Sequence, residues 1–322
     1  MNDKKDELKV AVIDVGSNST KILVAKFDSQ GSPSSVIEKS FPCRLLNAES
    51  QKLGLILPRQ LEQIGYVLGI LLGISREHAS DHLILVATEA FRRAGNRDEV
   101  AKHIEKEFGH KLHILSGLQE AELIAEGVNS DPLIQVEKHL QVFDLGGGSL
   151  EIIESINGRT IFTRSLPLGV LALAESINFQ RDNAVGDDLK KALRETIFNI
   201  FMETGLSRTG KAKLIGLGGA IYYIRKIIVS RTGQQVGQCT HFSLDEISAL
   251  ADEFCTMSLN ERSSAFPALP PDRADVFPLV CLVIEQLMTY LRKECFRYST
   301  RNLRYGVASR VEKTKGSAVF SP

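Results

Sequence analysis

The sequence predicts a mixed α/β fold built from two copies of one unit. The main observation is a pattern that occurs twice: an apolar strand, an aspartate, a turn of small residues, a serine and a second apolar stretch. The first copy runs from Ala11 to Ser19 and the second from Gln141 to Ser149. Each copy predicts a strand–turn–strand hairpin whose turn presents backbone N–H groups. The length of 322 residues also favours two domains over one.

The composition is that of an ordinary globular protein, with 43% hydrophobic and 24% charged residues. The 39 basic and 39 acidic side chains balance, which argues against nucleic acid or an anionic membrane as a partner. The five cysteines lack the spacing of a zinc or disulfide site and are typical of a reducing cytosol. The start of the chain is charged, unlike a signal peptide, and the apolar stretch over 276–287 is too short to cross a bilayer. We therefore expect a cytoplasmic protein with no membrane segment.

The first half continues from its hairpin into alternating helices and strands. Apolar residues at helical spacing predict a helix over 57–72, with Pro58 in its first turn. The remaining expected elements are an extended segment ending near residue 41, a strand over 82–87, a helix over 97–108, a strand over 111–115 and a helix over 116–127. This order predicts a mixed sheet with helices on its faces.

The second half repeats this logic after the second hairpin. Ser243 and Glu246 have the spacing of a capping box and predict the start of a helix. The other expected elements are strands over 140–144, 150–156, 160–166 and 213–215, a glycine turn over 216–219 that opens a helix to residue 230, a long apolar helix over 271–294, a strand near 301–303 and a helix over 306–315.

Three turns have the composition of phosphate-binding sites. Small residues let the backbone approach a phosphate closely and align several N–H donors. Two of these turns belong to the hairpins, and the third is the glycine turn that opens a helix. The expected phosphate-binding residues of the turns are Gly16, Ser17, Asn18, Ser19, Gly146, Gly147, Gly148, Ser149, Gly218 and Gly219. The alternative interpretation is ordinary β-turns and tight strand–helix packing.

Asp14 and Asp144 end the first strand of each hairpin, where a carboxylate could hold Mg²⁺ directly or through water. Two turns that face each other across a cleft would clamp a chain of phosphates, with the two aspartates beside it. Aspartate is also a common turn former, which is the plainer explanation of either copy alone. Because the motif occurs twice, we favour a phosphate site with a divalent cation, Mg²⁺ or a similar ion.

Further charged residues lie next to these turns. Ser116 and Gln119 form a capping box, and Glu120 follows in the first helical turn, where it could activate a water or simply favour the helix dipole. Glu151 lies two residues past the second turn and could share its face, or could face a neighbouring strand or solvent. Arg92 follows a strand and is a residue type suited to bidentate phosphate binding, although a surface helix start also carries such charges.

These segments together resemble the exopolyphosphatase/guanosine pentaphosphate phosphohydrolase (Ppx/GppA) family, within the actin-like, sugar-kinase and Hsp70 ATPase superfamily. The resemblance runs in order over nearly the whole chain. The segments that carry it are Asp14–Ser19, Ala87–Asn96, Leu115–Ala121, Asp144–Glu151, Ser165–Gly169, Gly216–Gly219, Arg273–Asp275 and Leu303–Gly306.

The resemblance implies two ribonuclease H-like domains of the actin-like ATPase kind, with an interdomain cleft. Domain I would span 1–127 and be joined by a C-terminal helix over 305–320, and domain II would span 128–304. Glu120 falls on the family's water-activating glutamate, and Asp144 and Glu151 fall on the acidic residues that hold metal or position water. Glu120 and Glu151 are therefore the expected catalytic residues, and Asp14, Asp144 and Glu151 the expected metal ligands. Arg92 joins Asp14 and the turn residues in the phosphate-binding set.

The sequence departs from the family pattern at a few positions. Gln119 and Glu122 flank Glu120 where a glutamate and an arginine are usual. Ala172 stands where an arginine is common, and Ala220 where a threonine often follows the third turn. The helical extension of longer members does not follow the core, which favours shorter polyphosphates or nucleotide polyphosphates as substrates.

Three functions follow as hypotheses. The first is a Mg²⁺-dependent hydrolase that releases terminal orthophosphate from polyphosphate or guanosine pentaphosphate. The second is an ATP-dependent kinase of the same superfamily, although no separate acceptor-binding motif is evident. The third is a sensor that binds polyphosphate or an alarmone with little or no catalysis, which the altered positions 119, 122 and 172 keep open. A homodimer is a further expectation, because the apolar helix over 277–287 suits an interface as well as a core.

Overall fold

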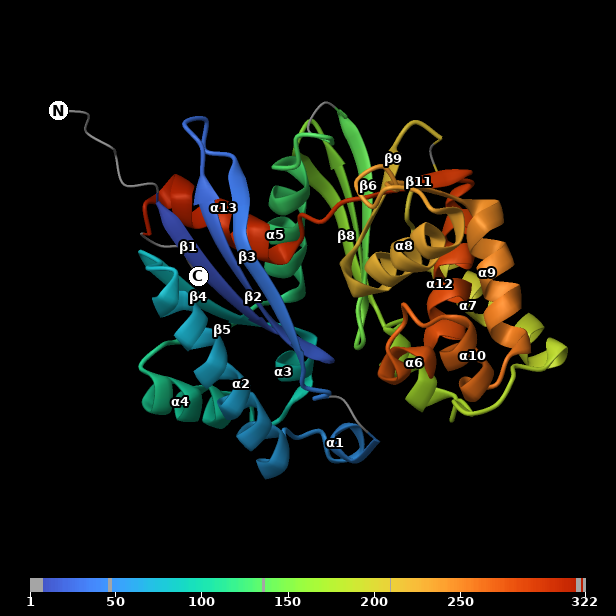
Figure 1. Ribbon diagram of the computed structural model, residues 1–322, viewed down its shortest axis with the longest axis horizontal. Helices are drawn as coiled ribbons and strands as arrows, with labels where there is room; N and C mark the ends of the chain where they lie inside the picture. The colour runs from blue at the N-terminus through green and yellow to red at the C-terminus, as the bar shows by residue number, and fades with distance from the viewer. Residues whose placement is uncertain (1–7, 46–47, 135–136, 209, 317–319, 321–322) are drawn as a thin grey trace. The chain divides into compact units, whose positions relative to one another are not determined.

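The computed structural model describes residues 8–45, 48–134, 137–208, 210–316 and 320 (Figure 1). The chain divides into two compact units, the first formed by residues 1–136 with 301–322 and the second by residues 137–300. Each unit contains one sheet, which confirms the predicted mixed α/β class. The charged N-terminal segment 1–7 and positions 317–319 of the expected C-terminal helix lie outside the described residues.

The sheet of the first unit has five strands in the order β3-β2-β1-β4-β5. The hairpin strands are antiparallel, whereas β1, β4 and β5 run parallel to one another. Their carboxyl ends therefore meet at one edge of the sheet. The strands are β1 Lys9–Val15, β2 Ser19–Phe27, β3 Pro33–Pro42, β4 His82–Ala87 and β5 Leu112–Ile114.

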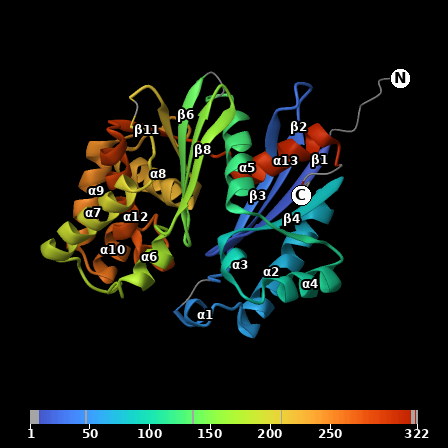
Figure 2. The ribbon, with the colours of Figure 1, turned by 180° about the vertical axis from the view of Figure 1, so that it is seen from behind.

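Helices cover both faces of this sheet (Figures 1 and 2). Ala11, Ile13 and Val15 of β1 belong to the core shared with α2, α3 and α4, whereas α13 packs against β1 and β2 and against α5. The strand period of two thus assigns the alternate residues of β1, Asp14 among them, to the face opposite that core. The helices are α1 Ala48–Leu53, α2 Pro58–Glu77, α3 Glu89–Arg93, α4 Arg97–Phe108, α5 Gly117–Asn129 and α13 Leu303–Thr314.

The sheet of the second unit repeats this arrangement and adds one strand. Its order is β8-β7-β6-β9-β11-β10, so β6 and β7 take the places of β1 and β2. The strands are β6 His139–Leu145, β7 Leu150–Ile156, β8 Arg159–Leu166, β9 Lys213–Leu217, β10 His241–Ser243 and β11 Cys295–Tyr298. The helices are α6 Val170–Ser176, α7 Asp187–Met202, α8 Gly218–Thr232, α9 Leu244–Thr256, α10 Leu259–Ala265, α11 Pro271–Ala274 and α12 Phe277–Leu291.

Several predicted bounds are confirmed and two predictions are wrong. The strands over 82–87 and 150–156 and the helix over 97–108 have their predicted bounds. The single helix over 271–294 is instead α11 and α12, because Pro278 lacks the N–H that would continue a helix and begins α12 in its first turn. The strand near 301–303 is absent from the described residues, since Asn302 caps α13 and the last strand is β11.

The residues of α12 lie almost entirely in the core of the second unit. Its one acidic residue, Glu285, is buried and accepts two hydrogen bonds of 2.8 Å from the Arg194 guanidinium. The apolar character of this helix is therefore used in packing within the unit. Among the described residues, no helix combines the length and apolar character needed to cross a membrane.

Two glycines allow α5 and α13 to cross at very short range. A Cβ atom on Gly306 would stand 1.7 Å from the carbonyl oxygen of Leu123, and one on Gly127 would stand 2.3 Å from that of Asn302. Side chains at either position would force the two helices apart. The crossing therefore fixes α13 against the helix that carries Glu120 near its start.

We predict that Gly306→Ala destabilises the protein by about 1–3 kcal/mol or more, because neither backbone can yield without moving a packed helix. The measurement is urea unfolding. Gly73→Ala in α2 is the matched control, since a Cβ there meets no atom within 4 Å. This control should stabilise by roughly 0.5–1 kcal/mol through helix propensity. Equal effects of the two substitutions would contradict the close crossing.

Candidate active site

The predicted site residues of the first unit gather at the carboxyl ends of its parallel strands. In the sheet register Val15 pairs with Ala87, and Ala87 with Ile114. The segments that leave these strands are the first glycine turn, the Thr88–Arg93 segment and the Leu115–Glu120 segment. In α/β sheets this edge is the usual place for ligands. Asp14, Arg92 and Glu120 are thus brought to one edge of the same unit, although 106 positions separate the first from the last.

The first turn is held from behind by the chain that follows β3. The Gly16 N–H donates to the Ser19 carbonyl at 3.2 Å and closes the turn. The carbonyls of Ser17 and Asn18 accept hydrogen bonds from the N–H groups of Leu45 (2.8 Å) and Cys43 (3.0 Å). Because a trans peptide directs its C=O and N–H in opposite senses, the N–H groups of Asn18 and Ser19 point away from this segment.

The second turn has the same closure and is braced by α6. The Gly146 N–H donates to the Ser149 carbonyl at 3.0 Å. The carbonyl of Gly146 accepts from Val170, and that of Gly147 from Leu171 and Ala172, at 2.9–3.1 Å. The N–H groups of Gly147 and Gly148 consequently point away from α6, as a phosphate-binding turn requires.

Gly169 makes this brace possible. A Cβ atom at this position would lie 2.1 Å from the carbonyl carbon of Gly148 and 2.1 Å from the Ser149 nitrogen. Only glycine lets the start of α6 come so near the turn. Ala172, one of the departures from the family pattern, is buried and contributes its N–H to the same brace.

The third turn is shorter than predicted. Gly216 and Leu217 belong to β9, and α8 begins directly at Gly218. Gly216 is required by packing, since a Cβ would stand 2.7 Å from the Phe143 ring and 2.9 Å from the Phe296 ring. Gly218 has φ +86°, and a Cβ there would lie 2.3 Å from Oδ1 of Asp144. The third turn and Asp144 are therefore direct neighbours.

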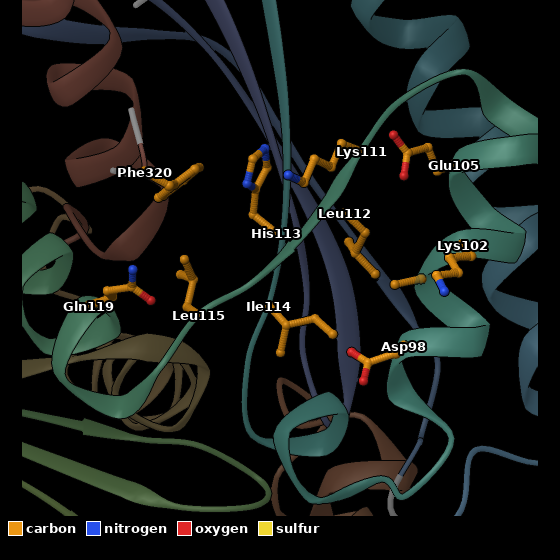
Figure 3. Close-up of a pocket in the computed structure, with 11 residues that line it drawn as sticks. Asp98, Lys102, Glu105, Lys111, Leu112, His113, Ile114, Leu115, Gln119 and Phe320 are labelled. Carbon is orange, nitrogen blue, oxygen red and sulfur yellow. The ribbon is translucent and has the colours of Figure 1, made fainter. Parts of the chain in front are cut away.

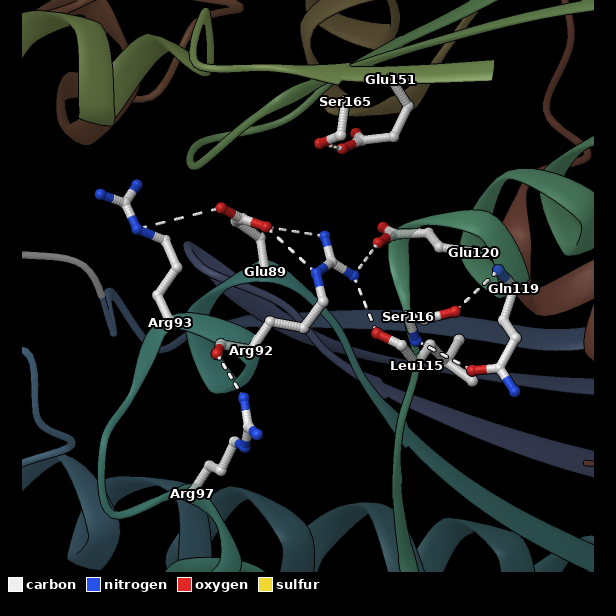
Figure 4. Close-up of polar contacts among 10 residues, drawn as sticks. All are labelled: Glu89, Arg92, Arg93, Arg97, Leu115, Ser116, Gln119, Glu120, Glu151 and Ser165. Carbon is white, nitrogen blue, oxygen red and sulfur yellow. Dashed lines mark hydrogen bonds and ion pairs between the residues drawn. The ribbon is translucent and has the colours of Figure 1, made fainter. Parts of the chain in front are cut away.

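Two carboxylates face each other in the second unit. Asp144 on β6 pairs directly with Glu151 on β7, so both side chains lie on one face of the sheet. Glu151 accepts a 2.9 Å hydrogen bond from the Ser165 hydroxyl on β8, which Figure 4 draws. Like charges directly opposite on neighbouring strands are unfavourable. A divalent cation would offset this repulsion, and carboxylates are the oxygen ligands that Mg²⁺ uses.

The corresponding pair in the first unit has opposite charges. Asp14 pairs with Lys21 across the hairpin. Burial raises the pKa of the Asp14 carboxyl above its ordinary value, against the opposing charges of Lys21 and Arg304. The Oδ1 atom of Asp14 is buried and has no hydrogen-bond partner among the described residues. The first unit therefore balances its aspartate with cations, whereas the second unit opposes its aspartate with another carboxylate.

Glu120 forms an ion pair with Arg92 (Figure 4). Nη1 of Arg92 donates to Glu120 and, at 3.0 Å, to the Leu115 carbonyl. Nε and Nη2 donate to one oxygen of Glu89 at 3.1 and 2.8 Å. Burial lowers the pKa of Arg92, but the carboxylates of Glu120 and Glu89 outweigh it and hold this pKa above the ordinary value. Arg92 is thus a fixed cation between two glutamates.

The residues around Glu120 explain part of the departure from the family pattern. The Ser116 hydroxyl accepts from the Gln119 N–H at 3.2 Å, and the Gln119 side chain accepts from the Ser116 N–H at 2.9 Å. This confirms the predicted capping box, which an amide serves as well as a carboxylate. Glu122 lies 3.9 Å from Arg310 of α13, so its charge has a cation partner within the unit.

Sequence reasoning missed three charged residues at these edges: Glu89, Lys21 and Arg304. Glu89 stands three positions before Arg92, the spacing of neighbours on a helix, and that spacing could have indicated the pair. Lys21 could have been found from the antiparallel pairing of the hairpin. Arg304 comes from the far end of the chain, and no local signal links it to Asp14.

The metal expectation fits the second unit better than the first. Among the described residues, no cluster of three or more His, Cys, Asp or Glu side chains could hold a metal ion. Mg²⁺ is commonly bound by one or two carboxylates together with substrate phosphates and water. Asp144 and Glu151 supply such a pair beside two glycine turns, and a bound phosphate would complete the ligand set.

A separate hollow of about 500 Å³ lies along β5, between α4 and the start of α5 (Figure 3). The His113 and Phe320 rings stand 4.5 Å apart on its wall. Its lining includes Lys102, Lys111 and Gln119 but none of the predicted phosphate, metal or catalytic residues. The hollow therefore borders the Leu115–Glu120 segment, but Arg92 and Glu120 are not among its lining residues.

The whole of this arrangement lies within a segment that matches one known protein family. The model of the Ppx/GppA phosphatase family matches residues 8–315. The chain belongs to this family. The segments that carried the resemblance, from the first glycine turn to the start of α13, all lie inside the matched range.

The relatives carry two kinds of name. The chain is 27% identical over 320 residues to a Haemophilus influenzae protein described provisionally as an exopolyphosphatase, covering 95% of this chain and 92% of that protein. It is 26% identical over 308 residues to the guanosine-5'-triphosphate,3'-diphosphate pyrophosphatase of Pseudoalteromonas translucida, covering 92% and 58%. Over 162 residues it is 30% identical to exopolyphosphatase 1 of Mycobacterium leprae, covering 50% and 47%. This chain thus spans about half the length of the two longer relatives.

Solved Ppx/GppA structures share the fold. An exopolyphosphatase from Cytophaga hutchinsonii has a TM-score of 0.84 at 22% identity, covering 95% of this chain and 98% of that one. The Aquifex aeolicus member of the family has a TM-score of 0.81 at 24% identity, covering 96% and 99%. At these identities the likeness establishes the fold alone. It confirms the predicted actin-like two-domain class.

Asp14 yields a prediction about pH. Its folded-state pKa lies above the ordinary value, so its ionised form costs stability at pH 7, and this cost disappears as the pH falls below about 4. Asp14→Asn should raise Tm at pH 7 by roughly 2 °C or more. The gain should vanish near pH 3.5, measured by calorimetry of the metal-free protein at both pH values. A Tm that falls at pH 7 would contradict this interpretation of the burial.

Proposed function

We propose that the protein releases terminal orthophosphate from inorganic polyphosphate or guanosine pentaphosphate, with Glu120 activating the attacking water. The observation that carries the proposal is the Arg92–Glu120 pair at the edge that also bears the first glycine turn. A phosphoanhydride needs donors for its charged oxygens and a carboxylate for the water proton, and this edge supplies both. The substrates come from the names of the relatives.

Each residue then has a stated task. The N–H groups of the first turn and the Arg92 guanidinium donate to phosphate oxygens and stabilise the charge that develops there. The Glu120 carboxylate accepts the proton of the water. In the second unit the N–H groups of Gly147 and Gly148 bind phosphate, and Asp144 and Glu151 would hold Mg²⁺. The cation would neutralise phosphate charge when bound.

Glu120→Gln tests the base. We expect kcat for phosphate release to fall by at least about 100-fold, because an amide cannot accept the water proton. Binding of the substrate should survive, as measured by calorimetric titration. Glu122→Gln removes the same charge from the same helix and serves as the matched control. A Glu120→Gln protein that releases phosphate at the wild-type rate would refute the assignment.

The same assay distinguishes the substrates and the competing functions. The panel contains polyphosphates of short, medium and long chain, guanosine pentaphosphate and tetraphosphate, and ATP with and without an acceptor. Release without an acceptor supports a hydrolase over a kinase. Tight binding without release from any member supports a sensor. Faster turnover of very long polyphosphate would contradict the expected preference for short chains.

The cation proposal has its own test. Chelation of Mg²⁺ should abolish phosphate release. Glu151→Gln should raise the Mg²⁺ concentration for half-maximal rate by roughly tenfold, because one of the two opposed carboxylates is lost. Glu203→Gln, an exposed site of the same unit, is the control. Equal Mg²⁺ dependence of both variants would exclude Glu151 as a ligand.

A further inference from the structure

Glu89 has no role in the proposed chemistry, yet it accepts two of the four hydrogen bonds that Arg92 donates. A single oxygen of Glu89 accepts from both Nε (3.1 Å) and Nη2 (2.8 Å) of the guanidinium. Two hydrogen bonds fix the plane of a guanidinium better than one. They leave Nη1 directed at Glu120 and the Leu115 carbonyl.

The fold enforces this arrangement. Glu89 and Arg92 are the first and fourth residues of α3 and therefore lie on the same helix face. The helix begins directly after β4, and the parallel neighbour β5 delivers Leu115 and the start of α5 beside it. The side chains of Glu89, Arg92 and Glu120 are 21%, 17% and 9% exposed, so their charges interact with little screening by water.

The charges of this group do not suit the resting protein to bind a polyanion. One cation stands between two carboxylates, and Arg92 makes four hydrogen bonds in all. A guanidinium has five N–H groups, so a bidentate contact to phosphate requires it to release a present partner. A phosphate oxygen accepts hydrogen bonds as a carboxylate oxygen does, and the phosphate group carries more negative charge.

We infer that Glu89 is a positioning residue that holds Arg92 so that the guanidinium exchanges Glu120 for a phosphate oxygen of the substrate. The exchange ends the hydrogen bond from Arg92 to Glu120 when a phosphate binds. Glu89 keeps its two hydrogen bonds to Arg92 throughout the exchange and so holds the guanidinium in its position. This inference rests on the proposed function, because it concerns the release of the same base.

The alternative is that Glu89 only forms ion pairs with arginines on the surface of its own helix. Its other oxygen lies 3.9 Å from Nε of Arg93, a half-exposed residue on the same helix. Pairs of this kind contribute little to stability and nothing to chemistry. Only a readout that depends on Arg92 separates the two roles.

The test is a double-mutant cycle of Glu89→Gln and Arg92→Gln, with phosphate release and polyphosphate binding measured on the full chain. Glu89→Gln alone should lower kcat by about tenfold, because the guanidinium loses its fixed orientation and pairs more tightly with Glu120. KM should stay constant or fall, since a negative charge has left the site. Glu62→Gln, an exposed position on α2, is the matched control and should match wild type.

In the Arg92→Gln background, Glu89→Gln should have no further effect on kcat. The loss of kcat in the double variant should therefore be smaller than the product of the two single losses by at least about threefold. Arg92→Lys provides a second route, because lysine keeps the charge but lacks the planar fork. Arg92→Lys should lower kcat as Glu89→Gln does, and adding Glu89→Gln to it should not lower kcat further. Thermal unfolding of each variant shows whether the fold is retained.

The outcomes separate the inference from the proposed function. An unchanged kcat in Glu89→Gln, or losses that multiply in both double variants, would overturn the positioning role. Wild-type release by Glu120→Gln would overturn the proposed base itself, whatever Glu89 does. Loss in Glu120→Gln with additive effects at 89 and 92 would leave the proposed function intact and remove only this inference.

Discussion

The constraint on which the candidate site depends is the direction of a few peptide groups. In both hairpin turns the carbonyls are held from one side, by the chain after β3 in the first unit and by α6 in the second. A planar trans peptide then has its N–H groups on the other side. The phosphate binding that we propose for the turns would therefore depend on hydrogen bonds to their carbonyls, and the small residues are needed to let the bracing segments approach. Gly169 is the clearest case, because any side chain there would collide with the turn.

The two hairpins have the same geometry, but the residues that face their aspartates carry opposite charges. The two turns close with the same hydrogen bond, and each aspartate meets one residue across its hairpin. That residue is Lys21 in the first unit and Glu151 in the second. A cation beside Asp14 suits an anion site, whereas a second carboxylate beside Asp144 suits a divalent ion. This asymmetry supports different proposed roles for the two turns, an anion site in the first unit and a cation site in the second.

Much of the fold could be predicted from sequence because its signals are local. The hairpins follow from alternation and small turns, and the capping boxes at Ser116 and Ser243 gave the starts of two helices. The prediction over 271–294 failed because apolar character was weighed above the proline that starts α12. The contact between Arg92 and Glu120 was beyond reach, since it depends on the register of β4 against β5. Residue type and place in the chain thus indicated the candidate site residues, but they gave no role to Glu89, the partner that fixes Arg92.

The last helix, α13, contacts both the hairpin that carries Asp14 and the helix that carries Glu120. Arg304 lies under the first hairpin, donating to the Ile22 carbonyl at 2.9 Å and to Glu38 at 3.0 Å, and its charge acts on Asp14. Two residues later, Gly306 sets the same helix against α5, which begins with the turn that bears Glu120. A displacement of α13 would therefore reach the aspartate and the glutamate together. Because helices packed backbone to backbone move as one body, the end of the chain helps to fix the spacing of two site residues that belong to its beginning.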